Sequence, residues 1–295
     1  MPTVLRSDAL LAWRHQQLQD GGNPSDLDWL LDLAGGLRWP LLQQLRLRPD
    51  QSVSLKCSLP ELEELWSHHR LHHTPLQYLV GVCPWRDLEL QVGPGVLIPR
   101  QETELLVELA LERARGGETG PSSPWADLGT GSGCIAVAIA RALPTSRGYA
   151  VDASEAALQQ AAINLERHQL SNQVNLLHGS WWEPLQAHWG QLHLVLSNPP
   201  YIPTAVWRNL EPVVHNHEPS LALDGGSDGL DAIRTIANGA GQALAPGGWL
   251  LLEHHHDQSK PVSQLLAQAG LVNIQSHADL EGKLRFASAQ RASHA

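Results

Sequence analysis

Four consecutive residues in the stretch LHLVLSNPPYIP could hold a planar amino group. Asn198, Pro199, Pro200 and Tyr201 follow an apolar run typical of a buried strand. Neither proline donates a backbone N–H, and each restricts the residue before it to extended geometry, so the strand should end in a rigid corner. The Asn198 side-chain oxygen and the Pro199 carbonyl could each accept one N–H, while Tyr201 could stack on a flat group. A plain strand stop is the alternative on these residues alone.

A glycine-rich loop in ADLGTGSGCIAVAIA is the second candidate. It contains Gly129, Thr130, Gly131, Ser132 and Gly133. Glycines allow a close approach to a ligand and a positive φ. A dinucleotide fingerprint would need glycine at the position of Cys134, and the Gly-Lys-Ser/Thr of a phosphate loop is absent from this stretch. The loop therefore predicts a nucleotide-like pocket without a pyrophosphate cradle.

Side chains that follow the next two expected strands could complete such a pocket. Asp152 ends the strand in YAVDAS, where a carboxylate can accept both hydroxyls of a ribose. Trp181 or Trp182 in HGSWWEP could offer a flat face to adenine, with Trp181 preferred. The alternative is a tight turn with Asp152 as a helix cap. An adenosine without pyrophosphate, bound beside a reactive group, indicates S-adenosyl-L-methionine as cofactor and S-adenosyl-L-homocysteine as product.

Alternating strands and helices should position these residues. Apolar runs predict strands at residues 125–129, 147–154, 174–180, 192–198 and 247–254, separated by helices at 134–143, 155–168, 229–244 and 260–269. This alternation predicts an α/β fold with a parallel sheet covered on both faces. Residues 271–279 and 284–290 have no helix between them, which favours an antiparallel pair at one edge.

The first third of the chain has a different pattern. Residues 1–74 carry Leu and Trp at helical spacing and are expected to be helical, without strands. Ser58 and Glu61 form a capping-box pattern at the start of one helix, with Leu59, Leu62, Leu65 and Trp66 on one face. Residues 75–99 alternate apolar side chains between glycines and prolines, which predicts a β-hairpin connector. Residues 100–295 form the third segment.

Composition limits the classes of function. The chain has 295 residues, 42% of them apolar, and a net charge of −10 with only 20 Lys and Arg, which argues against a broad nucleic-acid footprint. Its three widely spaced cysteines are expected to be reduced thiols. Early charges argue against a signal peptide, and no apolar run approaches the roughly 18 residues of a membrane span. We expect a soluble cytoplasmic monomer.

Several motifs resemble those of known enzymes. DLGTGSG, AVDAS and SNPPYIP are similar to the class I methyltransferases. GVLIPRQETELLVE, EPSLALDGGSDGLDAIRTI and LAPGGWLLLEHHHDQ resemble a narrower family, the release-factor glutamine N(5)-methyltransferases of the PrmC/HemK type. This resemblance runs from about residue 75 to the end of the chain.

The resemblance implies a fold, a substrate and site residues. Residues 100–295 would form a Rossmann-like methyltransferase domain with an antiparallel last strand. The substrate would be the glutamine of the Gly-Gly-Gln loop in class I peptide chain release factors, docked by the N-terminal helices and the hairpin. Arg100, Glu102 and Glu104 would lie near the rim of the pocket. A helix N-terminus with acidic residues in its first turn is the alternative for these three.

The chain departs from the family pattern at several positions. Gln101 replaces a usual proline, and Ser180 replaces an aspartate, which would weaken a hydrogen bond to adenine. His254, His255 and His256 replace Ile-Gly-Tyr. Because residues of a strand alternate between faces, these three histidines should not converge on a metal, and no metal is expected.

Two other functions compete with the glutamine methyltransferase. A methyltransferase acting on adenine or guanine amino groups would share the Asn-Pro-Pro-Tyr corner but would need a basic channel and space for a flipped base. A non-catalytic binder that keeps the fold would be expected to have lost the glycine loop or Asn198. Both are intact.

Overall fold

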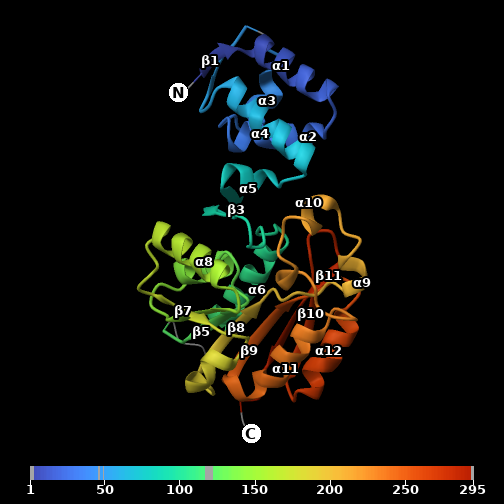
Figure 1. Ribbon diagram of the computed structural model, residues 1–295. Coiled ribbons are helices and arrows are strands. Elements are labelled where there is room, and N and C mark those ends of the chain that lie inside the picture. Colours follow the sequence, from blue (N-terminus) through green and yellow to red (C-terminus); the bar gives the residue numbers. More distant parts are fainter. Residues whose placement is uncertain (1–2, 46, 49, 117–121, 294–295) are drawn as a thin grey trace. The chain divides into compact units, whose positions relative to one another are not determined.

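The computed structural model describes residues 3–45, 47–48, 50–116 and 122–293, which form two compact units (Figure 1). Unit 1 comprises Met1–Val82 together with Pro212–His217. Unit 2 comprises Cys83–Glu211 and Glu218–Ala295. The residues 75–99, expected to be a separate connector, are divided between the two units.

Unit 1 is built from short helices around an apolar centre. Its helices are α1 (Ser7–Gln19), α2 (Pro24–Leu33), α3 (Trp39–Leu45), α4 (Leu59–His72), α5 (Leu76–Val80) and α10 (Pro212–His215). The core includes Leu10, Leu30 and Trp66, each fully buried. The predicted helices at α1 to α4 are confirmed, because their Leu and Trp residues recur at helical spacing and pack on one another.

The expectation that residues 1–74 lack strands is wrong. Strands β1 (Thr3–Arg6) and β2 (Ser52–Leu55) pair in an antiparallel two-stranded sheet. In β2, Val53 and Leu55 are buried while the serines beside them are exposed. Four residues give only two periods of alternation, and their partner lies about fifty residues away in the sequence, so the pattern is too short to recognise locally.

The capping box at the start of α4 is confirmed. The Ser58 backbone N–H donates to Glu61 Oε2 at 2.6 Å, and the Glu61 N–H donates to Ser58 Oγ at 3.4 Å. Leu62 and Trp66 are buried on the inner face of this helix, with Leu59 and Leu65 partly buried beside them. The cap therefore fixes where the helix begins, and the apolar stripe fixes which face it buries.

We expect Ser58→Ala to lower the free energy of opening of α4 by about 1 kcal/mol, because it removes a side-chain acceptor from the first turn. Hydrogen exchange of the α4 amides in the full-length protein measures this. The control is Ser67→Ala in the middle of the same helix, which removes a hydroxyl without affecting the cap. Equal effects of the two substitutions would contradict a capping role for Ser58.

The predicted hairpin is confirmed. It consists of β3 (Val82–Trp85) and β4 (Leu88–Gln91), which pair with each other. Leu88, Leu90 and Val92 are buried, as their alternation predicts. The preceding helix α5 was not expected. It begins after Pro75 and ends at Gly81, whose φ of 78° suits a helix end.

Unit 2 is organised by a seven-stranded sheet of order β10-β11-β9-β8-β5-β6-β7. Its strands are β5 (Trp125–Leu128), β6 (Gly148–Asp152), β7 (Val174–His178), β8 (Leu192–Ser197), β9 (Leu244–Glu253), β10 (Val272–Ala278) and β11 (Leu284–Gln290). Strands β5 to β9 are parallel, whereas β11 runs antiparallel to both β9 and β10. The predicted α/β fold and its antiparallel pair at one edge are confirmed.

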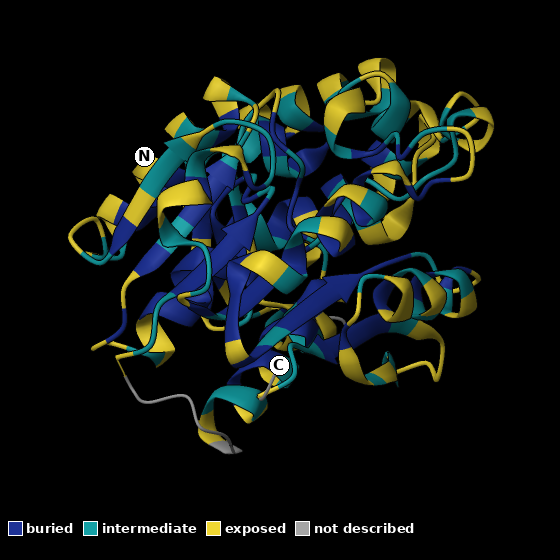
Figure 2. Cartoon of the chain, turned by 90° about the horizontal axis from the view of Figure 1, so that it is seen from below, coloured by how far each residue is buried: buried dark blue, intermediate teal, exposed yellow. Residues whose placement is uncertain are grey.

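Helices cover both faces of this sheet. Helices α6 (Thr103–Gly116), α7 (Cys134–Ala142) and α8 (Glu155–Arg167) pack on one face. Helices α11 (Asp231–Ala243) and α12 (Ser259–Gln268), with the short η1 (Glu183–His188), pack on the other. The central strands β5, β8 and β9 are mostly buried (Figure 2), whereas the edge strands β7 and β10 are largely exposed or half-buried. With both faces covered, a ligand has access to the ends of the strands.

Candidate active site

Strand register brings the predicted site residues to one edge of the sheet. Leu128 on β5 pairs with Val151 on β6 and with Ser197 on β8. Ser197 also pairs with Leu252 on β9. The residues that follow these four positions are Gly129, Asp152, Asn198 and Glu253. They therefore emerge side by side at the carboxyl ends of the central strands, where ligands bind in folds of this type.

A pocket at this edge contains most of the predicted site. Among the predicted residues it is lined by Gly129, Thr130, Gly131, Ser132, Asp152, Trp181, Asn198 and Pro200. Gly133, Pro199 and Tyr201 are not part of its wall. Gly133 instead caps α7 with a φ of 80°. Pro199 is buried, and Tyr201 is turned toward β9.

Asp152 ties the glycine loop to the end of β6. Its Oδ2 accepts the Gly131 N–H at 2.8 Å, and its Oδ1 accepts the Ser154 N–H at 2.9 Å. Burial raises the pKa of this carboxyl above its usual value. Each carboxylate oxygen has a second lone pair, so Asp152 can hold the loop and still accept hydroxyl groups from a ligand.

The glycine loop is also held by the buried carboxyl group of Asp127. Thr130 Oγ1 donates to Asp127 Oδ2 at 2.6 Å, and burial raises the pKa of Asp127 to about 7. Gly129 and Gly131 have φ values of 74° and 56°, a backbone geometry that favours glycine. The Ser132 hydroxyl is buried without a hydrogen-bond partner among the described residues, although Ser132 lines the pocket.

The two tryptophans after β7 have different roles. Trp181 lines the pocket, and its ring lies so close to Gly129 that a Cβ there would be 3.3 Å from Cζ3. Trp182 is buried in the core and donates from Nε1 to the Ile236 carbonyl at 3.1 Å. The preference for Trp181 as a pocket residue agrees with its position. Ser180 also lines the pocket, where the family pattern has aspartate.

Asn198 is held by residues that the sequence reasoning missed. Its Nδ2 donates to Thr103 Oγ1 at 2.9 Å, and Thr103 Oγ1 donates to Glu253 Oε2 at 2.7 Å. The Tyr201 hydroxyl donates to the other carboxyl oxygen of Glu253 at 3.2 Å. Burial raises the pKa of Glu253 to about 7. Glu253 is the last residue of the apolar strand β9, just as Asp152 is the last residue of β6. A carboxyl group at the end of an apolar strand is a sequence signal that could have identified Glu253.

Arg100 lines the pocket, but Glu102 and Glu104 do not. Arg100 Nη2 pairs with Glu218 Oε1 at 2.6 Å, and Glu218 Oε2 also accepts the Ile98 N–H at 3.2 Å. Glu218 is buried, so this pair ties the segment before α6 to the loop after the Asn-Pro-Pro-Tyr corner. Glu104 binds the backbone N–H of Arg86 instead, and Gln101 is exposed outside the pocket.

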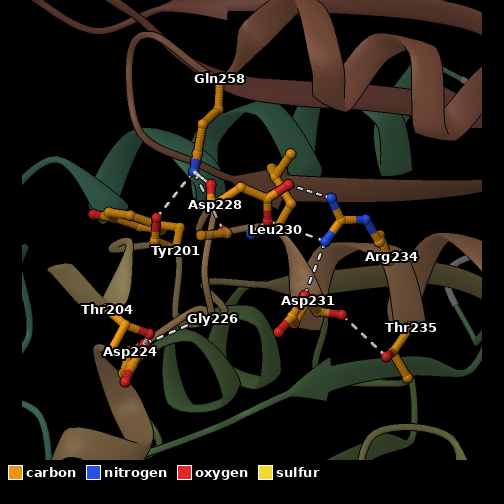
Figure 3. Close-up of polar contacts among 11 residues, drawn as sticks. Tyr201, Thr204, Asp224, Gly226, Asp228, Leu230, Asp231, Arg234, Thr235 and Gln258 are labelled. Carbon is orange, nitrogen blue, oxygen red and sulfur yellow. Dashed lines mark hydrogen bonds and ion pairs between the residues drawn. The ribbon is translucent and has the colours of Figure 1, made fainter. Parts of the chain in front are cut away.

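The loop that contains Asp228 and Gly229 is tied to the backbone of the corner by polar contacts (Figure 3). The Gln258 side-chain nitrogen donates to the Tyr201 carbonyl at 3.0 Å and to the carbonyls of Asp228 and Gly229 at 3.3 Å. A Cβ on Gly229 would lie 2.2 Å from the backbone carbonyl oxygen of Tyr201. Glycine at this position and the buried Gln258 therefore let the loop touch the corner backbone directly.

We expect Gly229→Ala to destabilise the protein by several kcal/mol, because the added methyl displaces the Tyr201 carbonyl in addition to the roughly 1–2 kcal/mol of positive-φ strain. The control is Gly190→Ala, which has a φ of 76° but open space around its Cβ position. Thermal unfolding of both variants measures the difference. Equal melting temperatures would show that the loop can move aside and does not brace the corner.

The run of histidines lies beyond strand β9, which ends at Glu253. The argument from strand alternation therefore does not apply to it. His254 is buried, whereas His255 pairs with Asp257 on the surface at 2.6 Å. Within the described ranges, no group of three or more His, Cys, Asp or Glu side chains is arranged to hold a metal ion.

In the same ranges, no helix is long and apolar enough to cross a membrane.

Sheet order, glycine loop and corner together define a methyltransferase of class I. Residues 101–216 match the family described as Methyltransferase small domain. The catalytic domain of hMettl16, solved in complex with the MAT2A 3'UTR hairpin 6, is similar in fold, with a TM-score of 0.56. It is 11% identical and the match covers 83% of this chain and 86% of that chain, so this similarity shows the fold alone.

Curated relatives define the family more narrowly. The release factor glutamine methyltransferase of Prochlorococcus marinus is 48% identical over 285 residues, which cover 97% of each chain. The protein of the same name from Gloeobacter violaceus is 47% identical over 87% of each chain. That of Streptomyces coelicolor is 37% identical over 96% of this chain and 98% of its own. This chain belongs to the release factor glutamine methyltransferase family.

Proposed function

We propose that this enzyme methylates the side-chain amide nitrogen of the glutamine in the Gly-Gly-Gln motif of class I peptide chain release factors, in the cytoplasm. S-adenosyl-L-methionine is the proposed methyl donor and S-adenosyl-L-homocysteine the product. The relatives that match along nearly the whole chain carry this protein-methylating name, which favours a protein over a nucleic-acid substrate. The observation that carries the proposal is that Asn198 faces the same pocket as Asp152 and Trp181.

Residues of the pocket fit an adenosine-type donor. The buried Ser132 hydroxyl has no partner within the described part of the chain, and a Cβ on Gly131 would meet nothing within 4 Å, so the loop leaves space beside a polar group. Asp152 would accept the ribose hydroxyls, and Trp181 would lie against the adenine. When bound, S-adenosyl-L-methionine supplies a methyl group attached to a positively charged sulfur.

The corner would act by positioning. The Asn198 side-chain oxygen makes no hydrogen bond among the described residues, and we propose that it accepts one N–H of the glutamine amide. The Pro199 carbonyl would accept the other. Because the Pro199 carbonyl belongs to a rigid backbone and the Asn198 side chain is held by Thr103, the two acceptors would hold the nitrogen with little reorganisation during the reaction. The nitrogen loses a proton readily once methylated, so the site needs no strong general base.

Two further roles complete the proposal. Tyr201 was expected to cover the substrate amide, but its hydroxyl binds Glu253 and its side chain lies outside the pocket wall. We propose that Tyr201 supports the corner through this hydrogen bond.

We further propose that the helices of unit 1, several of whose apolar side chains are exposed, dock the release factor. These side chains include Trp29, Trp39 and Leu71.

Mass spectrometry of a purified release factor, incubated with this protein and S-adenosyl-L-methionine, tests the proposed function. The expected result is one added methyl group on the glutamine of the Gly-Gly-Gln peptide. An unmodified peptide, obtained with demonstrable cofactor binding, would overturn the proposal. Methyl transfer to RNA or DNA instead, measured in parallel, would establish the nucleic-acid alternative.

A further inference from the structure

A buried chain of hydrogen bonds leads away from the pocket behind Asn198. It runs from Asn198 Nδ2 to Thr103 Oγ1 and from there to Glu253 Oε2, over 2.9 and 2.7 Å. Thr103 is 2% exposed and Glu253 is 1% exposed. Glu253 has no salt bridge among the described residues; its partners are the Thr103 and Tyr201 hydroxyls. A buried carboxyl held by two hydroxyl groups beside a catalytic amide calls for an explanation beyond packing.

The direction of each hydrogen bond follows from the chemistry of the groups. An ionised carboxylate can only accept, so both hydroxyls must donate to Glu253. Thr103 has a single hydroxyl hydrogen, which this bond uses. Its oxygen can therefore only accept from Asn198, and the edge of the Asn198 amide that faces Thr103 must be the NH₂ group. The carbonyl edge is then left for the pocket.

We propose that Glu253 and Thr103 are positioning residues that fix the Asn198 amide with its oxygen toward the substrate. The catalytic consequence rests on the function proposed above. An amide turned by 180° would present NH₂ to the N–H groups of the substrate, two donors facing each other. The two amide orientations have the same shape, so packing alone cannot select between them. The hydroxyl of Thr103, polarised by Glu253, makes the selection.

This arrangement depends on the charge of Glu253. If Glu253 takes up a proton, it can donate to Thr103 Oγ1, and the Thr103 hydrogen becomes free to bond the oxygen of Asn198. The constraint on the amide is then lost. The charged groups acting on Glu253 are Glu102, which favours protonation, and Arg285, which opposes it, and the neutral Tyr201 hydroxyl also opposes protonation by donating to the carboxylate. Since burial places this pKa at about 7, turnover should fall as the pH decreases through that value.

Thr103→Val and Thr103→Ser separate positioning from packing. Valine keeps the shape but removes the hydroxyl, so we expect kcat to fall about 10- to 100-fold while the KM for release factor changes little. Serine keeps the hydroxyl and should restore most of kcat. The acid limb of the kcat profile should persist in Thr103→Ser and disappear in Thr103→Val, because valine uncouples Asn198 from Glu253.

A measurement without turnover separates this inference from the proposed function. The side-chain amide signals of Asn198 can be followed by NMR in protein with ¹⁵N-labelled asparagine and assigned by their loss in Asn198→Asp. We expect them to shift with a midpoint near pH 7 in the wild type and in Thr103→Ser, and to be pH-independent in Thr103→Val. This result does not require methylation of any substrate.

Three results would overturn the positioning role. One is a wild-type kcat in Thr103→Val, and another is an equal loss in Thr103→Val and Thr103→Ser. The third is an Asn198 amide signal that is insensitive to pH in the wild type. If the wild-type protein fails to modify the release factor but its Asn198 signal titrates as described, the proposed function is wrong and the orientation of the amide stands.

Discussion

We expect Asn198→Ala to reduce kcat by about 10²- to 10³-fold, the effect of losing one preorganised hydrogen-bonding group that acts on the reacting atoms. The dissociation constant for S-adenosyl-L-methionine should change little, because the ribose and adenine would be held by Asp152 and Trp181. Single-turnover methylation and calorimetric titration of the cofactor measure the two effects separately.

Asn209→Ala is the control for this substitution. Asn209 lies on the same segment after the corner, but it is exposed and donates to the Ala205 carbonyl at 2.8 Å, away from the pocket lining. It should keep the wild-type kcat. If Asn198→Ala weakened cofactor binding as much as turnover, Asn198 would be a cofactor ligand, and the proposed grip on the substrate amide would be wrong.

Asp152→Ala should weaken binding of S-adenosyl-L-methionine about 10- to 100-fold. The substitution removes a charged acceptor for the ribose hydroxyls, and hydrogen bonds to charged groups contribute about 1.5–3 kcal/mol. It also leaves the Gly131 N–H without its acceptor, which loosens the glycine loop. Isothermal titration calorimetry measures the binding loss, and thermal unfolding reports any loss of stability.

Two further variants separate these contributions. Asp152→Asn keeps an acceptor oxygen, so it should retain more of the affinity than alanine does. Glu155→Ala removes an exposed carboxylate from the first turn of α8, three residues away, and should bind cofactor normally. An unchanged dissociation constant in Asp152→Ala, with an intact fold, would place the ribose elsewhere.

Much of the site could be predicted from local sequence. The glycine loop, Asp152 and the Asn-Pro-Pro-Tyr corner each lie at the end of a strand that its apolar residues identify, and parallel strands bring such positions to one edge. The capping box of α4 was equally accessible, because Ser58 and Glu61 are only three residues apart. The strand ends, the glycine loop and the helix cap each depend on residues close together in the chain, so the local pattern of residue types specifies them.

Tertiary structure decided which groups support those residues. Thr103 lies between two acidic residues and looks like part of a helix start, yet its hydroxyl binds Glu253, 150 residues away in the sequence. Likewise, the local sequence predicts a stacking role for the ring of Tyr201, and only the tertiary structure shows that its hydroxyl donates to the same carboxyl. The pairing of β1 with β2 also joins segments that are far apart in the sequence, so it too is decided by the tertiary structure.

The sequence by itself therefore determined the alternation of strands and helices that builds the seven-stranded sheet, the glycine loop, and the Asp152 and Asn198 side chains at the strand ends. Only the tertiary structure decided how Asn198 is oriented, through Thr103 and Glu253, and how Gln258 and Gly229 brace the corner. The physical reason is that periodicity and turn chemistry act over a few residues. A buried hydrogen bond depends instead on strand register and helix packing, which are set by the whole core at once.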